Sequence, residues 1–117
     1  PSVENAFQAA KTADPEERKL FETAPPTQAR RLGQKTTMRE RWDYHRVNVM
    51  QELVRAKFEK PDLQEKLLAT GDEPLEETNK THDNYWGACQ CARCKGKLGL
   101  NWLGRILMTV RRELREQ

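Results

Sequence analysis

The stretch His82–Met108, HDNYWGACQCARCKGKLGLNWLGRILM, contains two kinds of sequence, and the interpretation of the whole chain starts from it. Its first half is irregular, is interrupted by glycines and holds all three cysteines, which is typical of a loop. From Asn101 onward the apolar residues have the spacing of a helix, and Asn101 can cap that helix. A loop rich in reactive side chains beside a well-specified helix favours a functional site on a rigid support.

A zinc site is one interpretation of this stretch. Its ligands would be Cys89, Cys91, Cys94 and the preceding His82. Structural zinc binds four nitrogen or sulfur ligands, which commonly come as two CxxC-like pairs separated by a spacer. Here the CxC step is tight, and the single CxxC is not followed by a second pair. The spacing therefore favours free thiols, and we expect no bound metal.

A ligand-binding clamp is the other interpretation. Asp83, Tyr85, Trp86 and Asn101 offer a carboxylate, two aromatic rings and an amide within one short stretch. Such groups bind flat, polar molecules, because the rings stack and the polar groups accept or donate hydrogen bonds. The residues alone leave both interpretations open.

Composition sets limits on the class of protein. The chain has 117 residues, 33% of them charged and 36% apolar, which predicts one folded domain with a well-solvated surface. The net charge of +3 permits an anionic partner but does not establish one. An odd number of closely spaced cysteines favours a reducing, cytoplasmic setting. No apolar run approaches the roughly 20 residues that span a bilayer, so we expect no membrane partner.

The remaining pattern predicts a mainly α, compact multihelical single domain with one long irregular loop. Caps, prolines and apolar spacing mark the helices, and no stretch has the two-residue period of a strand. Gly33 is expected to end the third helix. The predicted helices are 2–11, 14–22, 27–32, 38–59, 62–69 and 102–115.

The first predicted helix carries a polar stripe. Glu4, Gln8 and Lys11 are spaced by four and three residues, so they lie on one helical face. Glu4 and Lys11 are about 10 Å apart along the axis at a rise of 1.5 Å per residue. Their long side chains could converge on one ligand, although an ordinary solvated face has the same pattern.

Four ordered motifs resemble the NADAR (YbiA-like) family. Pro1–Lys11 is similar to its "pSxEhxfqaxK" helix, His82–Gly87 to its "nDxyWG" element, and Asn101–Met108 to its "NxLGxxLM" terminus. Arg41–Asp43, with later apolar positions up to Gly71, resembles its central segment. The resemblance extends over essentially the whole chain, 1–117. It implies a YbiA-like fold and the cleavage of N-glycosidic bonds, either in a riboflavin-pathway intermediate or in ADP-ribosylated guanine.

The resemblance also implies roles for particular residues. Lys11 would be the nucleophile and Glu4 the acid and base, or Glu4 would instead activate water directly, with no cofactor. Substrate would be bound by four further residues, and a phosphate would be held by an arginine near the start of the long helix. Those substrate-binding residues are Trp42, Asp83, Trp86 and Asn101, and the arginine candidates are Arg39, Arg41 and Arg46.

The chain departs from the family pattern at several points. It begins after the upstream family segment, so we expect that segment to be missing. Asn5 stands where histidine is usual, His82 where asparagine is common, and a cysteine-bearing loop, 88–98, replaces a glycine-rich one. The expected partner is a small nucleotide-like molecule, with ADP-ribosylated nucleic acid as a second option. The alternative function is a non-catalytic binding module stabilised by zinc.

Overall fold

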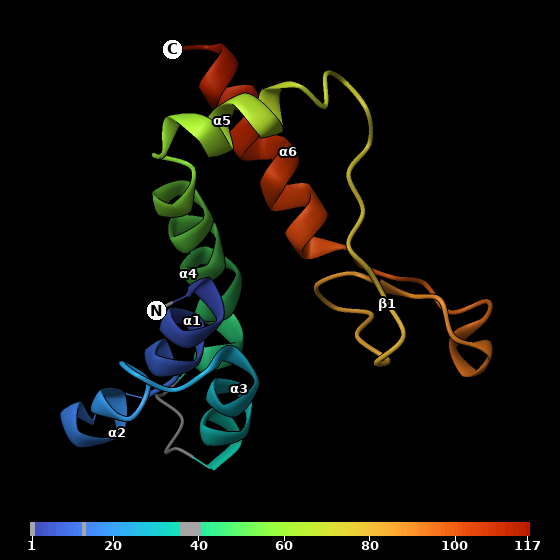
Figure 1. Ribbon diagram of the computed structural model, residues 1–117. Helices are drawn as coiled ribbons and strands as arrows, with labels where there is room; N and C mark the ends of the chain where they lie inside the picture. The colour runs from blue at the N-terminus through green and yellow to red at the C-terminus, as the bar shows by residue number, and fades with distance from the viewer. Residues whose placement is uncertain (1, 13, 36–40) are drawn as a thin grey trace. The chain divides into compact units, whose positions relative to one another are not determined.

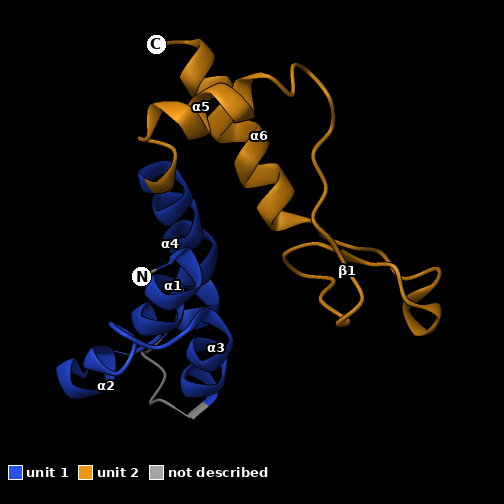
Figure 2. Cartoon of the chain, viewed as in Figure 1, with its two compact units in different colours: residues 1–56 blue, residues 57–117 orange. Residues whose placement is uncertain are grey.

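The computed structural model describes residues 2–12, 14–35 and 41–117. This part of the chain is mainly helical, which confirms the predicted fold class (Figure 1). It divides into two compact units, Pro1–Ala56 and Lys57–Gln117 (Figure 2), and each is described by itself. The described elements are α1 (Val3–Ala10), α2 (Pro15–Lys19), α3 (Pro26–Lys35), α4 (Trp42–Lys57), α5 (Pro61–Leu68), β1 (Thr78–Asn79), β2 (Ala88–Cys89), the 3-10 turn η1 (Ala92–Cys94) and α6 (Trp102–Arg115).

In the first unit, α1 packs against α2 and α3. The Ser2 hydroxyl caps α1 by accepting the Asn5 N–H at 3.1 Å. The Asn5 side chain is 2% exposed, and its amide nitrogen donates to the carbonyls of Phe21 at 2.9 Å and Ala24 at 2.6 Å. A buried amide that is fully bonded in this way fixes the segment between α2 and α3 to α1.

The predicted limits of α3 were wrong. The helix runs from Pro26 to Lys35, so Gly33 lies inside it and does not end it. A Cβ atom at Gly33 would lie 1.9 Å from the side-chain oxygen of Gln8 on α1. Glycine is therefore needed for the close approach of α1 and α3, which sequence periodicity does not reveal. The second helix is also shorter than predicted, since α2 ends at Lys19.

The long helix α4 begins at Trp42 and ends at Lys57. Its predicted start at Met38 lies outside the described residues. Arg41, directly before the helix, has φ of 58°, a left-handed conformation that a right-handed helix cannot include. Trp42 is 4% exposed, and its ring centroid is 5.2 Å from that of Phe7. This aromatic pair packs the start of α4 against α1.

In the second unit, α5 packs against α6. Leu67, Ile106 and Val110 are buried in this unit. The buried guanidinium of Arg111 donates to the hydroxyl of Thr70 at 2.7 Å, after the end of α5. Helix α6 has the predicted limits, Trp102–Arg115, because its apolar spacing is regular over the full length.

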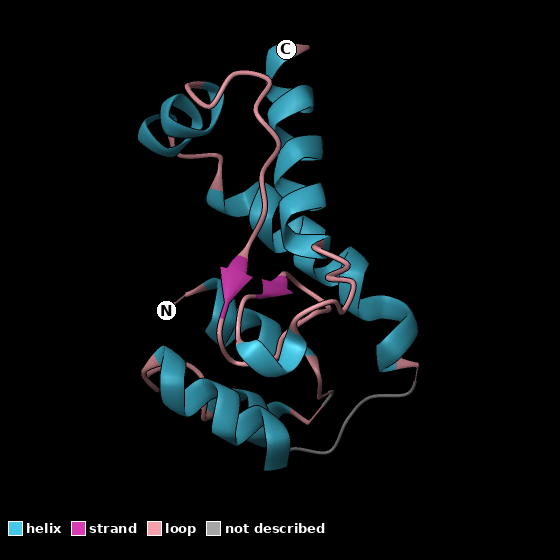
Figure 3. Ribbon diagram, turned by 90° about the vertical axis from the view of Figure 1, so that its right-hand side faces the viewer, coloured by secondary structure: helices cyan, strands magenta, loops and turns pink. Residues whose placement is uncertain are grey.

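The two strands were not predicted. β1 and β2 pair in parallel, with Thr78 opposite Ala88 and Asn79 opposite Cys89 (Figure 3). A two-residue strand is too short to show an alternating pattern, so the sequence contains no period to detect. Gly87 precedes β2, and a Cβ atom there would lie 2.2 Å from the Glu77 carbonyl oxygen. Glycine therefore permits this close pairing. Among the described helices, none combines the length and apolar character needed to cross a membrane.

Candidate functional site

The Glu4 carboxylate is held on the surface of α1 by two donors. Its Oε1 atom accepts a hydrogen bond from the Gln8 amide at 3.0 Å and one from Arg30 Nε, on α3, at 3.4 Å. The Glu4 side chain is 29% exposed, whereas Gln8 is buried. The carboxylate is thus fixed in direction but still accessible to a ligand.

Lys11 lies at the C-terminal end of the same helix. Its Nζ atom is 5.9 Å from the centroid of the Phe7 ring. Burial lowers the pKa of Lys11 below its ordinary value, Arg30 lowers it further, and the Glu4 carboxylate opposes both effects. A lowered pKa increases the fraction of neutral amine near neutral pH, and the neutral amine is the nucleophilic form.

An open recess of about 600 Å³ adjoins Glu4. This volume is in the range of small-molecule sites. Arg30 and Arg31 contribute two guanidinium groups to its lining, which favours an anionic ligand. Lys11 is not among the residues that line the recess. The complete lining is Glu4, Pro26, Thr27, Arg30, Arg31 and Gln34.

Trp42 lies in the first unit, where its ring packs against Phe7 of α1. Its low exposure favours a packing role over the predicted stacking on substrate. Among the predicted phosphate ligands, Arg39 lies outside the described residues. Arg46 lies 3.7 Å from the Asp43 carboxylate, one turn earlier on α4.

In the second unit, Asp83 organises a turn. Its Oδ1 atom accepts the backbone N–H groups of Tyr85 at 3.0 Å and Trp86 at 2.9 Å. The Asp83 N–H in turn donates to the side-chain oxygen of Asn79 at 3.1 Å. Trp86 is half-buried and meets Tyr85 edge-on, with ring centroids 4.9 Å apart. The carboxylate therefore fixes the backbone of the turn that carries Trp86.

Asn101 also makes hydrogen bonds within its unit. Its amide nitrogen donates to the Leu75 carbonyl at 2.8 Å, and its side-chain oxygen accepts the Glu77 N–H at 2.9 Å. The prediction that Asn101 caps α6 was wrong. The residue stands at the capping position with φ of 53°, but in the described chain its side chain caps no N–H of that helix. Asn101 instead connects α6 to the segment before β1.

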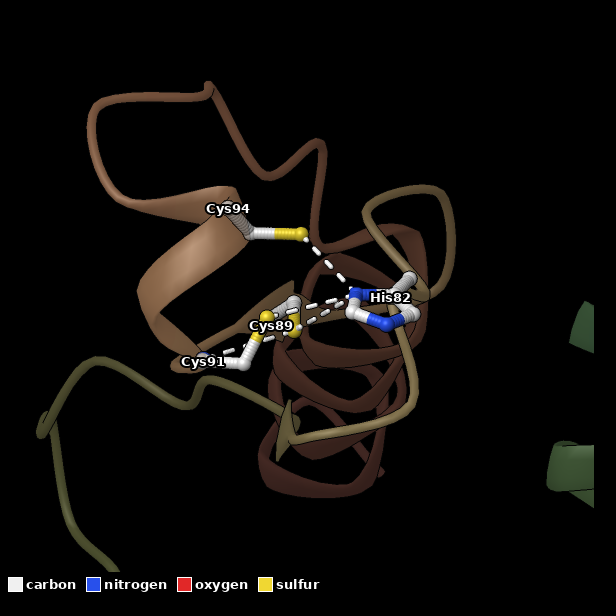
Figure 4. Close-up of side chains that lie close together, drawn as sticks. All are labelled: His82, Cys89, Cys91 and Cys94. Carbon is white, nitrogen blue, oxygen red and sulfur yellow. Dashed lines mark hydrogen bonds between the residues drawn. The ribbon is translucent and has the colours of Figure 1, made fainter.

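The three thiols and one imidazole form a tight cluster (Figure 4). The Nδ1 atom of His82 lies 3.2 Å from the sulfur of Cys91, 3.4 Å from that of Cys94 and 3.9 Å from that of Cys89. The cysteines are free, and two of them are buried. The Asn84 side chain accepts the Cys89 N–H at 2.8 Å and donates to the Cys94 sulfur at 3.5 Å.

The thiols of this cluster differ in acidity. Burial raises the pKa of Cys94. Burial also raises the pKa of Cys89, but hydrogen bonds, led by those from Cys91, outweigh it and lower the pKa to about 6. The Cys91 N–H donates to the Cys89 sulfur at 3.5 Å.

Each unit brings together some of the predicted residues. Glu4 and Lys11 share α1, and Asp83 and Trp86 share one turn. The contribution of Arg30 was not predicted, because this residue comes from another helix and nothing in its local pattern indicates that it meets Glu4.

Comparison with known proteins gives a consistent result. The model of the NADAR domain matches residues 1–115. An N-glycosidase of Nostoc punctiforme is 38% identical, over 97% of this chain and 74% of that protein. The N-glycosidase YbiA of Escherichia coli is 36% identical, over 97% of this chain and 70% of that protein. A riboflavin biosynthesis protein of Vibrio vulnificus is 39% identical, over 99% of this chain but only 31% of its own length.

The fold is equally similar. The NMR structure of the Escherichia coli protein YbiA matches with a TM-score of 0.84 and 35% sequence identity, over 97% of this chain and 67% of the other. The predicted YbiA-like fold is thus confirmed. Because the family model covers nearly every residue and the fold agrees, this chain belongs to the NADAR domain family.

Proposed function

We propose that this chain hydrolyses the N-glycosidic bond of a nucleotide-like molecule, with Lys11 and Glu4 as the reacting groups. The N-glycosidase class follows from the family and from relatives that carry this name. The same relatives favour an enzyme over a non-catalytic binding module. The single observation that supports the two residues is the lowered pKa of Lys11, on the same helix as a carboxylate that is held in place.

The chemistry requires one nucleophile and one proton donor. The carbon of an N-glycosidic bond has the oxidation level of an aldehyde, so the neutral amine of Lys11 can attack it. As the bond to the base nitrogen breaks, the Glu4 carboxylate takes the proton that the attacking amine gives up and passes it to that nitrogen. The sugar ring opens and leaves an imine on Lys11. Water then hydrolyses the imine, which releases the sugar and restores the amine. Alternatively, Glu4 activates water directly and Lys11 forms no bond.

The recess beside Glu4 supports a phosphorylated substrate. Arg30 and Arg31 line it, and guanidinium groups bind phosphate with paired, charge-assisted hydrogen bonds. We therefore propose these two residues of α3 as phosphate ligands, in addition to the arginines predicted from the sequence. Two phosphorylated substrates are compatible with this recess: a riboflavin-pathway intermediate and ADP-ribosylated guanine. The names of some relatives favour the first.

The residues predicted to bind substrate in the second unit fall into two groups. Trp86 keeps part of its indole accessible, so stacking on a flat base remains our proposal for it. The side chains of Asp83 and Asn101 already bond to backbone groups. Their contacts favour a positioning role, in which Asp83 directs Trp86 and Asn101 fixes the adjacent segment.

Trapping with borohydride tests the mechanism. The chain is incubated with a panel of phosphorylated N-glycosides, and release of free base identifies the substrate. Borohydride added during turnover is expected to reduce the imine, so that peptide mass spectrometry finds a sugar on Lys11. Lys11→Ala is expected to lose both adduct and activity. Lys19→Ala is the matched control, since Lys19 is exposed and its ammonium pairs with Glu16 at 3.4 Å on the same short helix. Full activity of Lys11→Ala without any adduct would refute the imine.

A further inference from the structure

We propose that His82, Cys89, Cys91 and Cys94 bind one structural zinc ion. Their four donor atoms lie within 4.8 Å of one another. In a tetrahedral site with zinc–sulfur bonds of about 2.3 Å and zinc–nitrogen bonds of about 2.0–2.1 Å, each nitrogen–sulfur edge is roughly 3.5 Å long. The three distances from His82 Nδ1 to sulfur, 3.2, 3.4 and 3.9 Å, lie on both sides of this value.

Hydrogen bonding alone does not explain this arrangement. The Nδ1 atom of an imidazole has either one proton or one lone pair, so it makes one good hydrogen bond in the plane of the ring. Here three sulfur atoms surround that single nitrogen (Figure 4). A disulfide would use two cysteines and leave the third unpaired. A central cation satisfies all four groups at once.

The local backbone directs the ligands toward one point. Cys89 belongs to β2, Cys91 directly precedes η1, and Cys94 ends it. The parallel pairing of β1 and β2 places Asn79 opposite Cys89, and His82 follows β1 by three residues with φ of 67°. A short strand pair and one turn of 3-10 helix are thus sufficient to assemble four ligands from two segments.

Donors around the sulfur atoms suit the thiolate form that a metal requires. The Asn84 amide nitrogen approaches the Cys94 sulfur at 3.5 Å, and the Cys91 N–H approaches the Cys89 sulfur at the same distance. Outer groups of this kind orient metal ligands and disperse their charge. Arg93, in η1, adds a positive charge to the same loop.

The ligand set identifies the metal and its role. Three thiolates and an imidazole are soft and borderline donors, a combination that favours zinc over magnesium or calcium. Four protein ligands complete the tetrahedron and leave no position for substrate, so the ion is structural. The proposal reverses the expectation from spacing, because the sequence shows the tight CxC step but not that His82 returns to the cysteines.

Native mass spectrometry of the full chain, loaded with zinc and then desalted, tests the proposal. We expect one zinc per chain, removed by a strong chelator. Cobalt added to the metal-free chain is expected to give the thiolate charge-transfer and tetrahedral ligand-field absorption of a cysteine-rich site. This measurement needs no mutation, so it stands even if a cysteine variant fails to fold.

Variants identify the ligands. His82→Ala and Cys94→Ser are expected to weaken zinc binding by more than the roughly 10- to 100-fold typical of outer-sphere partners. His45→Ala is the matched control, because His45 is the other histidine and lies on α4. A wild-type chain that binds neither zinc nor cobalt would overturn the proposal. So would a His82→Ala variant that binds zinc as tightly as the wild type.

Discussion

Replacing Asn5 with alanine tests how α1 is held in place. The substitution removes the amide that donates to the carbonyls of Phe21 and Ala24, at 2.9 and 2.6 Å. These contacts are buried, and a buried carbonyl that loses its donor costs about 1–2 kcal/mol. Two such carbonyls give a loss of roughly 2–4 kcal/mol in the free energy of unfolding. For a chain of this size that loss corresponds to a melting temperature lower by roughly 10 °C.

The assay is urea unfolding followed by circular dichroism, supported by thermal melts. A loss of 2–4 kcal/mol moves the urea midpoint by roughly 1–2 M, which is well resolved. Asn48→Ala is the matched control, because Asn48 is exposed on α4 and its loss removes no buried group. Its unfolding free energy is expected to stay within about 0.5 kcal/mol of the wild type.

The activity of the folded Asn5→Ala variant adds a second measurement. Asn5 follows Glu4 on α1, and its hydrogen bonds hold this helix in place. Without them the helix is held less firmly, which displaces both reacting groups. We expect a lower kcat/KM at a temperature where the variant is still folded. Equal melting temperatures for the Asn5 and Asn48 variants would refute the reasoning, because they would show that these two buried hydrogen bonds contribute nothing measurable.

Two further predictions concern the reacting groups. Activity is expected to rise with pH as Lys11 loses its proton. Arg30→Gln should move this rise to higher pH, because Arg30 lowers the pKa of Lys11. A pH profile of kcat/KM that is unmoved or shifted to lower pH would contradict this prediction. Gly33→Ala places a Cβ atom where the Gln8 side chain lies, so Gln8 can no longer hold Glu4. The loss of one hydrogen bond, about 0.5–1.5 kcal/mol, predicts a roughly 2- to 10-fold fall in kcat/KM in steady-state assays, and an unchanged value would contradict it.

The helices were predictable where their pattern is regular and their ends are determined locally. Helix α6 has the predicted limits, and α2 begins as predicted after Asp14, whose side chain accepts the Glu16 N–H at 2.9 Å. The limits of α6 depend on apolar spacing along the helix, and the start of α2 depends on residues within one turn of each other. Local sequence contains all the information needed for such contacts.

The predictions were wrong where a residue that is distant in the sequence determines the local structure. Gly33 looks like a helix end, but it lies inside α3 because Gln8 of α1 occupies the space beside it. Asn101 looks like a cap, but its side chain bonds instead to Leu75 and Glu77, which precede it by 26 and 24 residues. In both cases the residue type was informative, and its partner could be known only from the fold.

The candidate site shows the same division. The polar face of Glu4 and Lys11 follows from helical spacing, whereas Arg30 joins it through the packing of α3 on α1. The cysteines were visible at once, but their geometry with His82 depends on a strand pair of only two residues each. Sequence spacing therefore underestimates a metal site whose ligands come from separate segments.

The residues proposed to react and the residue proposed to stack on the base lie in different parts of the chain. Burial and the charges of Glu4 and Arg30 change the pKa of Lys11, and the recess beside Glu4 is lined by Glu4 and by residues of α3. The turn that carries Trp86 is instead fixed by Asp83, the residue directly after the proposed metal ligand His82. We therefore expect a change in the cysteine loop to act, through His82 and Asp83, on the turn that carries Trp86.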